Sequence, residues 1–346
     1  MYSVFMEYAP KGIANLGNTC YLNACIQILS RIEPLVQQIQ NGKLDHPNKM
    51  EVIMWKNWKD IVAIMQNAIS KEAKQELLHP SGFVTAIEQV SKHKKLTFFQ
   101  NHEQEDVSEF LLFFMDCLHE CQTREIDVQI SGQSKGEVDD MAILVYKKIK
   151  DTFERQFSEI ANMFYGVQVS RIQSVQTQQT ESQTPEVYYL LDMPVLSRRC
   201  TLYECFDKYV EKETLDGDNK WYNEKTESYE EVYKSMVFWS FPDVLVICLK
   251  RIQYDGRKNT ELVEYPITLD LRSYVAGYRQ STYMYDLMGV CLHEGNKDFG
   301  HYMAFIQKDA HWFFCNDDQV QKVDNEAHLI HPHAHCLFYV KKNNAL

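Results

Sequence analysis

The most constraining feature of this 346-residue sequence is that helical and strand patterns occupy different halves of the chain. In the first half, apolar residues recur at intervals near 3.6, which predicts helices over residues 20–32, 51–69, 83–90, 105–120 and 140–162. In the second half, segments rich in β-branched and aromatic residues predict strands over 186–191, 244–253, 285–294 and 302–307. Helices followed by strands predict an α+β fold whose two halves pack together.

Polar segments mark where the predicted elements end. Residues 131–136 are polar and contain glycine, and we expect them to form a loop before the helix at 140–162. A Gln/Thr/Ser tract at 173–185 is expected to be a surface turn, and the sequence Asp-Gly-Asp-Asn at 216–219 predicts another turn. No internal repeat is visible in this order of elements.

The net charge of the chain argues against partners that are themselves negatively charged. The chain has 36 basic and 48 acidic residues, which gives a formal net charge of −12. Nucleic acids and anionic membranes both require a basic protein surface, so we expect neither as a partner. The sequence opens without a charged-then-apolar leader, and its apolar runs are too short to cross a bilayer. We therefore expect no signal peptide and no transmembrane segment.

The ten cysteines indicate a compartment. No Cys-x-x-Cys pair occurs, and Cys25, Cys117, Cys248 and Cys291 lie in apolar stretches, where a reduced cysteine packs as a small hydrophobic residue. Reduced cysteines are typical of the cytoplasm and the nucleus. We therefore expect an intracellular protein, either cytoplasmic or nuclear.

The first segment that could take part in catalysis is Gly-Ile-Ala-Asn-Leu-Gly-Asn-Thr-Cys-Tyr-Leu-Asn at residues 12–23. A loop of glycines and asparagines delivers Cys20 to the first turn of a helix, which Asn18 or Thr19 can cap. At that position the helix dipole and free N–H groups favour the thiolate, which is the nucleophilic form of cysteine. A cysteine at a helix start is more often structural than catalytic, so this segment alone leaves both interpretations open.

The second segment runs over residues 300–318. His301 follows a glycine and enters an alternating strand, residues 308–310 reverse the chain, and the return strand ends in amide and carboxylate side chains. Such a hairpin can bring Asn316 or Asp317 beside His301, which would supply a general base together with the residue that orients it. A histidine alone in a strand is usually a core or surface residue, and the pattern does not choose between Asn316 and Asp317.

Together, these segments resemble the ubiquitin-specific proteases, which are papain-like cysteine deubiquitinases of peptidase family C19. Residues 12–23 resemble the Cys box of that family, and residues 285–320 resemble its His box. The resemblance covers residues 10 to 342, and further matches stand between the two boxes in the order of the family. These matches are residues 104–110, 215–220, 249–251 and 265–271.

The resemblance implies a papain-like cysteine protease fold in the hand arrangement of this family, with one catalytic domain over 10–342. A mainly helical thumb is expected over 10–160, β fingers over 161–245, and a mainly β palm with the catalytic His hairpin over 246–342. The implied function is thiol-dependent hydrolysis of the isopeptide or peptide bond after the C-terminal glycine of ubiquitin, through an acyl-enzyme thioester. An inactive ubiquitin-binding module and a protease for another ubiquitin-like modifier are the alternatives.

The same resemblance assigns catalytic roles. Cys20 corresponds to the nucleophile and His301 to the general base. Asn15 corresponds to the side-chain donor of the oxyanion hole, although a loop-shaping role would also explain an asparagine there. Asn316 corresponds to the third member of the triad, and Asp317 could serve instead or support the site.

The resemblance also assigns residues that contact ubiquitin. Asp106 and Glu109 correspond to acidic positions that face the arginine-bearing tail of ubiquitin, whereas their alternative role is a solvated first turn of a helix. His293 corresponds to a histidine near the active cleft, and a structural role is equally open for it. The implied partners are ubiquitin and ubiquitinated proteins, and we expect the chain to be a monomer.

The chain departs from its family at the metal site of the fingers. Many members bind zinc there with two Cys-x-x-Cys pairs, but the equivalent residues 170–176 and 221–226 contain no cysteine, and Cys200 and Cys205 have a different spacing. We therefore expect no metal and no cofactor. Histidines near the C-terminus could suggest a metal-binding tract, but residues 335–340 match the closing core strand of the family, so we expect loop and strand roles. The residues concerned are His328, His331, His333, His335 and Cys336.

Overall fold

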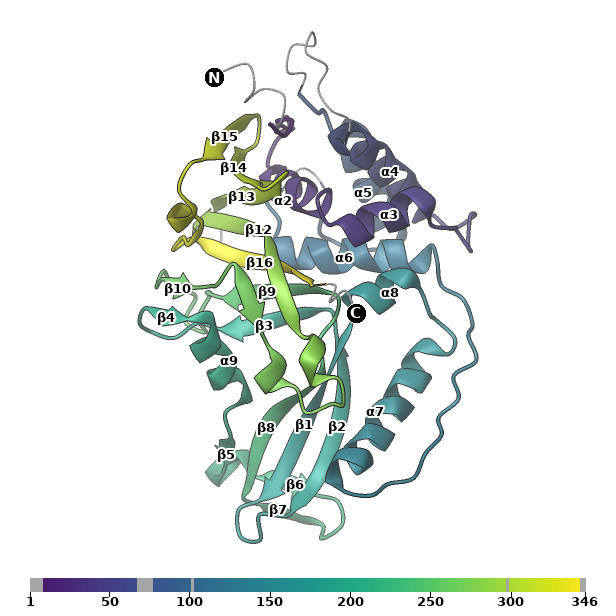
Figure 1. Cartoon of the computed structure of the whole chain (residues 1–346), viewed down its shortest axis with the longest axis vertical. Coiled ribbons are helices and arrows are strands. Elements are labelled where there is room, and N and C mark those ends of the chain that lie inside the picture. Colours follow the sequence, from purple (N-terminus) through teal and green to yellow (C-terminus); the bar gives the residue numbers. More distant parts are fainter. Residues whose placement is uncertain (1–8, 67–76, 101–102, 297–298, 343–346) are drawn as a thin grey trace.

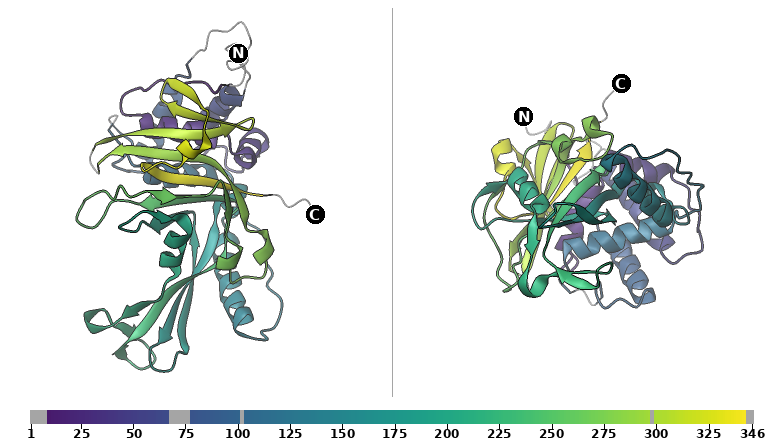
Figure 2. Two further views of the ribbon diagram at one scale, coloured as in Figure 1. Left: turned by 60° about the vertical axis from the view of Figure 1, so that its left-hand side comes forward. Right: turned by 90° about the horizontal axis from the view of Figure 1, so that it is seen from below.

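The computed structural model describes residues 9–66, 77–100, 103–296 and 299–342. Figure 1 shows a layer of helices from the N-terminal part of the chain, a large β-sheet packed against this layer, and a smaller sheet of long strands that extends away from both. The two further views in Figure 2 show the same three parts. The predicted α+β class is confirmed.

The helical layer surrounds one completely buried helix. Every residue of α2 is buried, so this helix lies in the interior between the other helices and the large sheet. In the described part of the chain, no helix combines the length and the apolar character that crossing a membrane requires. The helices of the layer are α2 (Cys20–Leu29), α3 (Glu33–Asn41), α4 (Val52–Gln66), α5 (Ser81–His93), α6 (Val107–Glu120) and α8 (Glu159–Phe164).

The helix boundaries differ by a few residues from the sequence-based expectation. The helix predicted over 20–32 ends at Leu29 because Ile32 is already the N-cap of α3, which has Pro34 in its first turn. The helix predicted over 51–69 is observed from Val52 to Gln66, and the remaining residues of that prediction lie outside the described part of the chain.

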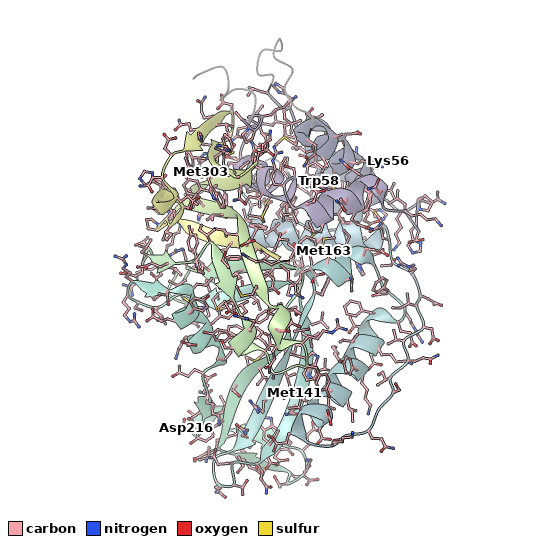
Figure 3. All side chains as sticks on the ribbon, viewed as in Figure 1. Lys56, Trp58, Met141, Met163, Asp216 and Met303 are labelled. Carbon is pink, nitrogen blue, oxygen red and sulfur yellow. A yellow bond between two sulfur atoms is a disulfide. The ribbon has the colours of Figure 1, made fainter. Side chains whose placement is uncertain are left out.

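Aromatic side chains hold α4, α5 and α6 together. Trp58 of α4, labelled in Figure 3, is 1% exposed, and its ring centroid lies 5.8 Å from Phe83 of α5 and 5.2 Å from Phe114 of α6. Phe83 and Phe114 also contact each other edge to face at 5.6 Å. Each such pair contributes about 0.5–1.5 kcal/mol beyond the burial of its apolar surface. This packing fixes the position of α6, whose first turn faces the large sheet.

The large sheet has the strand order β15-β14-β13-β12-β16-β9-β3, and β11 also pairs with β12. β3 runs parallel to β9, while the neighbours from β9 to β15 are antiparallel. Helix α2 packs on β12, β13 and β14. The strands are β3 (Leu190–Pro194), β9 (Val244–Lys250), β11 (Thr268–Asp270), β12 (Met284–Gly295), β13 (Gly300–Lys308), β14 (His311–Asn316), β15 (Gln319–Val323) and β16 (Ala334–Lys341).

The smaller sheet has the order β2-β1-β8-β5. Helix α7 (Glu137–Phe153) packs along β2, and the apolar cluster at this contact includes Met141, Val145 and Trp239; Figure 3 labels Met141 on this helix. The short hairpin of β6 and β7 lies at the far end of the sheet (Figure 1). The strands are β1 (Gly166–Ser174), β2 (Thr180–Tyr188), β5 (Glu213–Leu215), β6 (Trp221–Asn223), β7 (Ser228–Glu230) and β8 (Val232–Ser240).

Short elements complete the described chain. The predicted turn at 216–219 is observed as the 3-10 helix η1 (Gly217–Asn219). Helix α9 (Leu202–Val210) begins at Thr201 with a capping box, in which Thr201 and Glu204 satisfy each other's backbone N–H groups. The others are β4 (Cys200–Thr201), β10 (Val263–Glu264), η2 (Arg272–Tyr274), η3 (Gln280–Thr282) and η4 (Glu326–Leu329).

The prediction of one helix over 140–162 is wrong, because the structure has two helices there. α7 ends at Phe153, and α8 starts only at Glu159. Between them, Phe157 forms a β-bridge with Arg124, and Ser158 caps α8 by accepting a hydrogen bond from the N–H of Ala161 at 3.0 Å. The bridge and the cap both require extended backbone, which breaks the helical pattern.

The prediction of a surface turn over 173–185 is also largely wrong. β1 continues to Ser174 and β2 begins at Thr180, so the turn covers only the residues between them. Pro185 lies within β2. A proline is tolerated there because β2 is the edge strand of its sheet and needs no hydrogen bond from this residue on its outer side.

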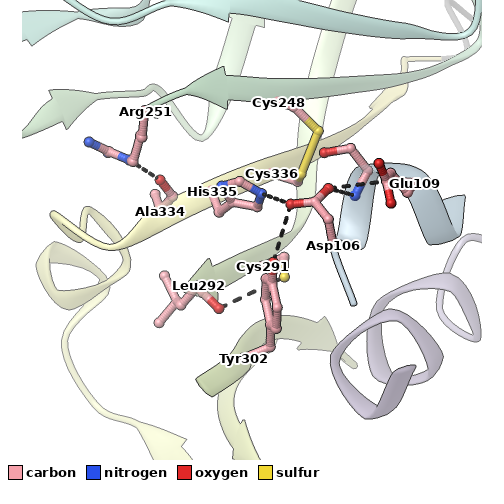
Figure 4. The surroundings of a disulfide bond; sticks show 11 residues. Asp106, Glu109, Cys248, Arg251, Cys291, Leu292, Tyr302, Ala334, His335 and Cys336 are labelled. Carbon is pink, nitrogen blue, oxygen red and sulfur yellow. Dashed lines mark hydrogen bonds and ion pairs between the residues drawn. A yellow bond between two sulfur atoms is a disulfide. The ribbon is translucent and has the colours of Figure 1, made fainter. Parts of the chain in front are cut away.

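The expectation that Cys248 packs as a reduced cysteine is contradicted. Cys248 of β9 lies directly opposite Cys336 of β16, with their Cα atoms 4.3 Å apart, and the two form a disulfide (Figure 4). The side chains of a directly opposed antiparallel pair lie close enough to be bridged in this way. Cys25, Cys117 and Cys291 are free and buried, as expected.

Candidate active site

The loop before α2 has the shape that its glycine and asparagine predict. Gly17 and Asn18 both have positive φ, at 98° and 55°, so the chain turns sharply just before the helix. Thr19 is the N-cap residue, but its side chain forms no capping hydrogen bond to the helix. Its hydroxyl instead accepts a hydrogen bond from the N–H of Leu16 at 2.9 Å, which closes the loop on itself. This turn places Cys20 at the first position of α2.

The thiol of Cys20 is buried beside the His hairpin. Cys20 is 4% exposed, and the backbone N–H groups of Tyr302, Tyr21 and Cys20 itself act on its thiol. Burial raises the pKa of the thiol, these N–H groups lower it, and the charge of Asp317 raises it, with a net increase over the ordinary value. In the free protein, burial therefore outweighs the stabilisation of the thiolate that the helix N-terminus predicts.

The hairpin of β13 and β14 brings Asn316 to His301. Asp309 and Ala310 at its tip have positive φ, at 48° and 60°, as a tight two-residue turn requires. The register of the two strands then places the end of β14 beside the start of β13. His301 Nε2 lies 2.6 Å from Asn316 Oδ1, so Nε2 carries a proton and donates it to the amide oxygen. Nδ1 is left as the nitrogen that can accept a proton from a thiol.

Asp317 connects the hairpin to the loop before α2. Its Oδ2 accepts a hydrogen bond from Asn15 Nδ2 and its Oδ1 accepts one from Asn23 Nδ2, both at 2.8 Å. Its backbone oxygen also accepts from the N–H of Ile13 at 2.8 Å. His301 Nε2 is 3.9 Å from Asp317 Oδ2, which is farther than from Asn316. Asn316 thus has the orienting contact, and Asp317 holds the two segments of the site together.

A family model described as ubiquitin carboxyl-terminal hydrolase matches residues 11–339, which include both of these segments. The chain belongs to the ubiquitin carboxyl-terminal hydrolase family. Among its relatives, it is 27% identical to ubiquitin carboxyl-terminal hydrolase 16 of Arabidopsis thaliana over 99% of this chain, and 28% identical to ubiquitin carboxyl-terminal hydrolase Usp2 of Drosophila melanogaster over 95% of it. The matched region covers 31% and 34% of these two relatives. The chain therefore spans only a third of their length.

Solved structures show the same fold. The model superposes on the SAGA Ubp8/Sgf11/Sus1/Sgf73 DUB module bound to ubiquitin aldehyde with a TM-score of 0.73 and 22% sequence identity, over 98% of this chain and 71% of that chain. The hand arrangement expected of a ubiquitin carboxyl-terminal hydrolase of this type is confirmed. The helical layer is the thumb, the large sheet is the palm, and the smaller sheet forms the fingers.

Asp106 lies where the helical layer meets the large sheet. It is the N-cap of α6, and its Oδ1 accepts hydrogen bonds from the N–H groups of Ser108 at 2.7 Å and Glu109 at 3.4 Å. Its Oδ2 faces the hydroxyl of Tyr302 at 3.4 Å and His335 Nε2 at 3.7 Å. Burial raises the pKa of Asp106, but its interactions with His335 and Ser108 outweigh burial and hold that pKa well below its usual range. The carboxylate of Asp106 is therefore ionised, and it caps the N-terminus of α6.

His293 packs between Tyr302 and Lys258, and its expected role near ubiquitin stays a prediction. Its ring stacks on Tyr302 with centroids 4.5 Å apart, and its Nδ1 lies 3.0 Å from Lys258 Nζ. Burial and the nearby charges of Lys258 and His335 lower the pKa of His293 to about 4. The imidazole ring of His293 leaves no room for a side chain at Gly300, because an added Cβ would lie 2.0 Å from His293 Nε2. His293 thus shapes the backbone just before His301.

Glu109, the other acidic residue expected to contact ubiquitin, is exposed on the first turn of α6.

Hydrogen bonds hold together the hairpin of β6 and β7, which includes residues 221–226. Asn223 Nδ2 donates to both oxygens of Glu230 across the hairpin of β6 and β7, at 3.2 and 3.1 Å. Thr226 and Ser228 donate to the same carboxylate. Within the described residues, no group of three or more His, Cys, Asp or Glu side chains could hold a metal ion. The expectation that this chain needs no metal stays a prediction.

Sequence reasoning missed three residues of the site. Asn23 stands three residues after Cys20, on the same face of α2, and this spacing was the available signal. Gln104 accepts a hydrogen bond from the N–H of Gly300 at 3.0 Å and so connects thumb and palm beside His301. His335 was expected to have a loop or strand role, and its approach to Asp106 depends on a strand irregularity that no local pattern predicts.

Proposed function

We propose that this chain hydrolyses the isopeptide or peptide bond after the C-terminal glycine of ubiquitin, with Cys20 as the nucleophile and His301 as the general base. The observation that carries this proposal is the meeting of two distant segments. The backbone N–H of Tyr302 acts on the thiol of Cys20, and the neighbouring His301 contacts Asn316 through a hydrogen bond of 2.6 Å. Nucleophile, base and orienting residue are the three parts that such a mechanism requires.

The reaction would proceed by acyl transfer. His301 Nδ1 accepts the proton of Cys20 as the sulfur attacks the glycine carbonyl carbon. The C–N bond then breaks, and the imidazolium gives the proton to the leaving amine, which leaves a thioester on Cys20. Water, deprotonated by His301, attacks the thioester and releases the carboxylate of ubiquitin and the thiol. Because burial raises the pKa of Cys20, proton transfer to the base is needed at neutral pH.

Asn15 is the proposed side-chain donor to the oxyanion. One N–H of its amide is held by Asp317, and its own oxygen accepts the N–H groups of Gly17 at 3.0 Å and Thr19 at 3.3 Å. These contacts fix the amide plane at the entrance to α2 and leave its second N–H available. With the backbone N–H groups at the start of α2, it would stabilise the oxyanion by about 3 kcal/mol.

The proposed substrate lies across the hand, with the ubiquitin tail between thumb and palm. The related SAGA DUB module is described as bound to ubiquitin aldehyde, which supports ubiquitin as the modifier. We assign the thumb to 10–160, the fingers to 161–245 and the palm to 246–342 of one catalytic domain, acting as a monomer inside the cell. The identity of the ubiquitinated protein is not part of the proposal.

The test is turnover of ubiquitin carrying a C-terminal fluorogenic group. Steady release of the fluorophore is expected, and unlabelled ubiquitin should compete better than other ubiquitin-like modifiers. Binding of ubiquitin without turnover would support the inactive ubiquitin-binding module instead. Faster turnover of another ubiquitin-like modifier would identify the chain as a protease for that modifier.

Asp106 and Glu109 are expected to bind arginines of the ubiquitin tail. Asp106→Asn keeps a good N-cap for α6 while removing the charge, so the KM should rise while the stability that the cap contributes is retained. An exposed ion pair contributes up to about 1 kcal/mol, or about fivefold in KM, and Asp106→Lys should raise the KM further. Glu109→Gln is expected to act in the same direction. Steady-state kinetics combined with urea unfolding measures both effects.

Asp106→Ala is the matched control for the capping role. It removes both the cap and the charge, so it should cost about 1 kcal/mol of stability in addition to raising the KM. A KM that is unaltered in Asp106→Asn and Asp106→Lys would reduce the role of Asp106 to capping α6.

A further inference from the structure

A β-bulge in β16 directs His335 toward the thumb. Cys291 of β12 pairs with Cys336, but the next residue, Leu292, pairs with Ala334, so His335 is an extra residue in β16. Bulges are frequent next to active sites because they re-aim the side chain of the extra residue. Figure 4 shows the imidazole of His335 pointing at the carboxylate of Asp106.

The imidazole of His335 is buried without a hydrogen-bond partner. His335 is 9% exposed, and neither ring nitrogen has a partner among the described residues. Its Nε2 is 3.7 Å from Asp106 Oδ2, which is within ion-pair range but too long for a hydrogen bond. Leaving such a polar group unsatisfied destabilises the folded protein. A buried, unsatisfied group in a native protein calls for a functional or structural explanation.

The ring faces a cavity of 110 Å³ between the thumb and the palm, and Asp106 and Tyr302 also line this cavity. The cavity has room for a few water molecules or a small side-chain group. The titratable and charged groups around His335 come from every neighbouring element: α6, β3, β12, β13, and the segment after β9. These groups are Asp106, Asp192, His293, Tyr302, Arg251, Lys258 and His333.

We propose that His335 is an internal counter-ion of Asp106 that controls, through its protonation, how strongly the ubiquitin tail binds. This inference rests on the proposed function, because it takes Asp106 to be a carboxylate that receives an arginine of that tail. With a neutral imidazole, the carboxylate is free to pair with the arginine. With a protonated imidazole, Asp106 is already paired, and the added positive charge repels the arginine. His335 acts through Asp106, so it is a positioning residue.

The sign of the effect follows from the groups involved. Imidazole ordinarily changes charge between pH 5 and 8, and the pKa of Asp106 lies far below that interval, so its carboxylate stays ionised. The pKa of His293 is lowered to about 4 and that of Lys258 to about 8. Between pH 7 and 5.5, His293 thus stays mostly neutral and Lys258 mostly charged. On this proposal, ubiquitin should bind more weakly at pH 5.5 than at pH 7.

Direct binding separates this effect from catalysis. Ubiquitin binding to the Cys20→Ala variant is measured by calorimetry at pH 7 and pH 5.5, with and without the second substitution His335→Gln. The Kd of Cys20→Ala should rise by about three- to tenfold at the lower pH, the size of a partly exposed ion pair. With His335→Gln, the Kd should change much less, because glutamine is polar but does not titrate. His333→Gln, two residues earlier in the chain, should keep the full shift.

Each outcome decides between the claims. An equal pH shift in the His335→Gln protein, or no shift in the parent, overturns the role of His335 and leaves the proposed function intact. No ubiquitin binding at either pH, in proteins whose thermal unfolding shows them folded, overturns the proposed function and this inference together. If His335→Gln fails to fold, His335→Asn is measured in its place. Ubiquitin with its tail arginines replaced by glutamine should lose the pH shift in the parent.

Discussion

Cys20→Ala is expected to lower kcat/KM for a ubiquitin conjugate by at least about 10⁴-fold, or about 5.4 kcal/mol of transition-state stabilisation. The reason is that, among the described free cysteines, Cys20 is the one that stands at a helix start beside the His hairpin. Burial raises the pKa of Cys121 and Cys315 to about 12. Cys20→Ser should lose nearly as much, because Asn316 gives His301 no carboxylate to support deprotonation of a hydroxyl.

Cys121→Ala is the control for this prediction. Cys121 is the C-cap residue of α6 and is buried like Cys20, so its loss perturbs packing without touching the proposed chemistry. It should retain most of the activity. Residual turnover by Cys20→Ala close to that of Cys121→Ala would show that the chemistry does not depend on Cys20.

The second large effect is expected at Asn316. Its amide oxygen lies 2.6 Å from His301 Nε2 and fixes both the ring orientation and the tautomer. Asn316→Ala should lower kcat by at least about tenfold, or 1.4 kcal/mol, while Asn316→Asp keeps an acceptor oxygen and should keep substantial activity. A thiolate–imidazolium pair carries its own charge balance, so a neutral amide is sufficient to orient the base.

Asp317 supplies the matched comparison. Its two carboxylate oxygens each accept an amide N–H, from Asn15 and from Asn23. Asp317→Ala should therefore lower activity by releasing the loop before α2 from the hairpin. Asp317→Asn keeps one acceptor oxygen and should be milder. The measured kcat values decide the assignment: wild-type activity in Asn316→Ala together with an inactive Asp317→Asn would transfer the orienting role to Asp317.

The site could be predicted in outline because its residues are specified locally. A cysteine at a helix start and a histidine followed by a hairpin are both short-range patterns, and the turn at Asp309 and Ala310 fixes which residues face each other. The choice of Asn316 over Asp317 came from resemblance, and the 2.6 Å contact supports it. The residue pattern alone could not choose between Asn316 and Asp317, because both stand at the end of the strand and the sequence does not show which side chain points at His301.

The features that sequence reasoning missed depend on long-range pairing. The disulfide of Cys248 and Cys336 joins residues 88 positions apart and requires β9 and β16 to be neighbours in a given register. The bulge that aims His335 at Asp106 likewise depends on how β16 pairs with β12. The helix predicted over 140–162 failed for a related reason, since the bridge from Arg124 to Phe157 competes with helix formation. Periodicity records which residues are apolar, but it does not record which strands meet.

The central claim is that Cys20 attacks the C-terminal carbonyl of ubiquitin, and one labelling experiment tests it most directly. Ubiquitin carrying a C-terminal electrophile is incubated with the protein, and the modified cysteine is located by mass spectrometry of its peptides. The account predicts one ubiquitin per chain, attached to Cys20, and no adduct with Cys20→Ala. Attachment to another cysteine, or labelling of Cys20→Ala at the rate of the unaltered protein, would contradict it.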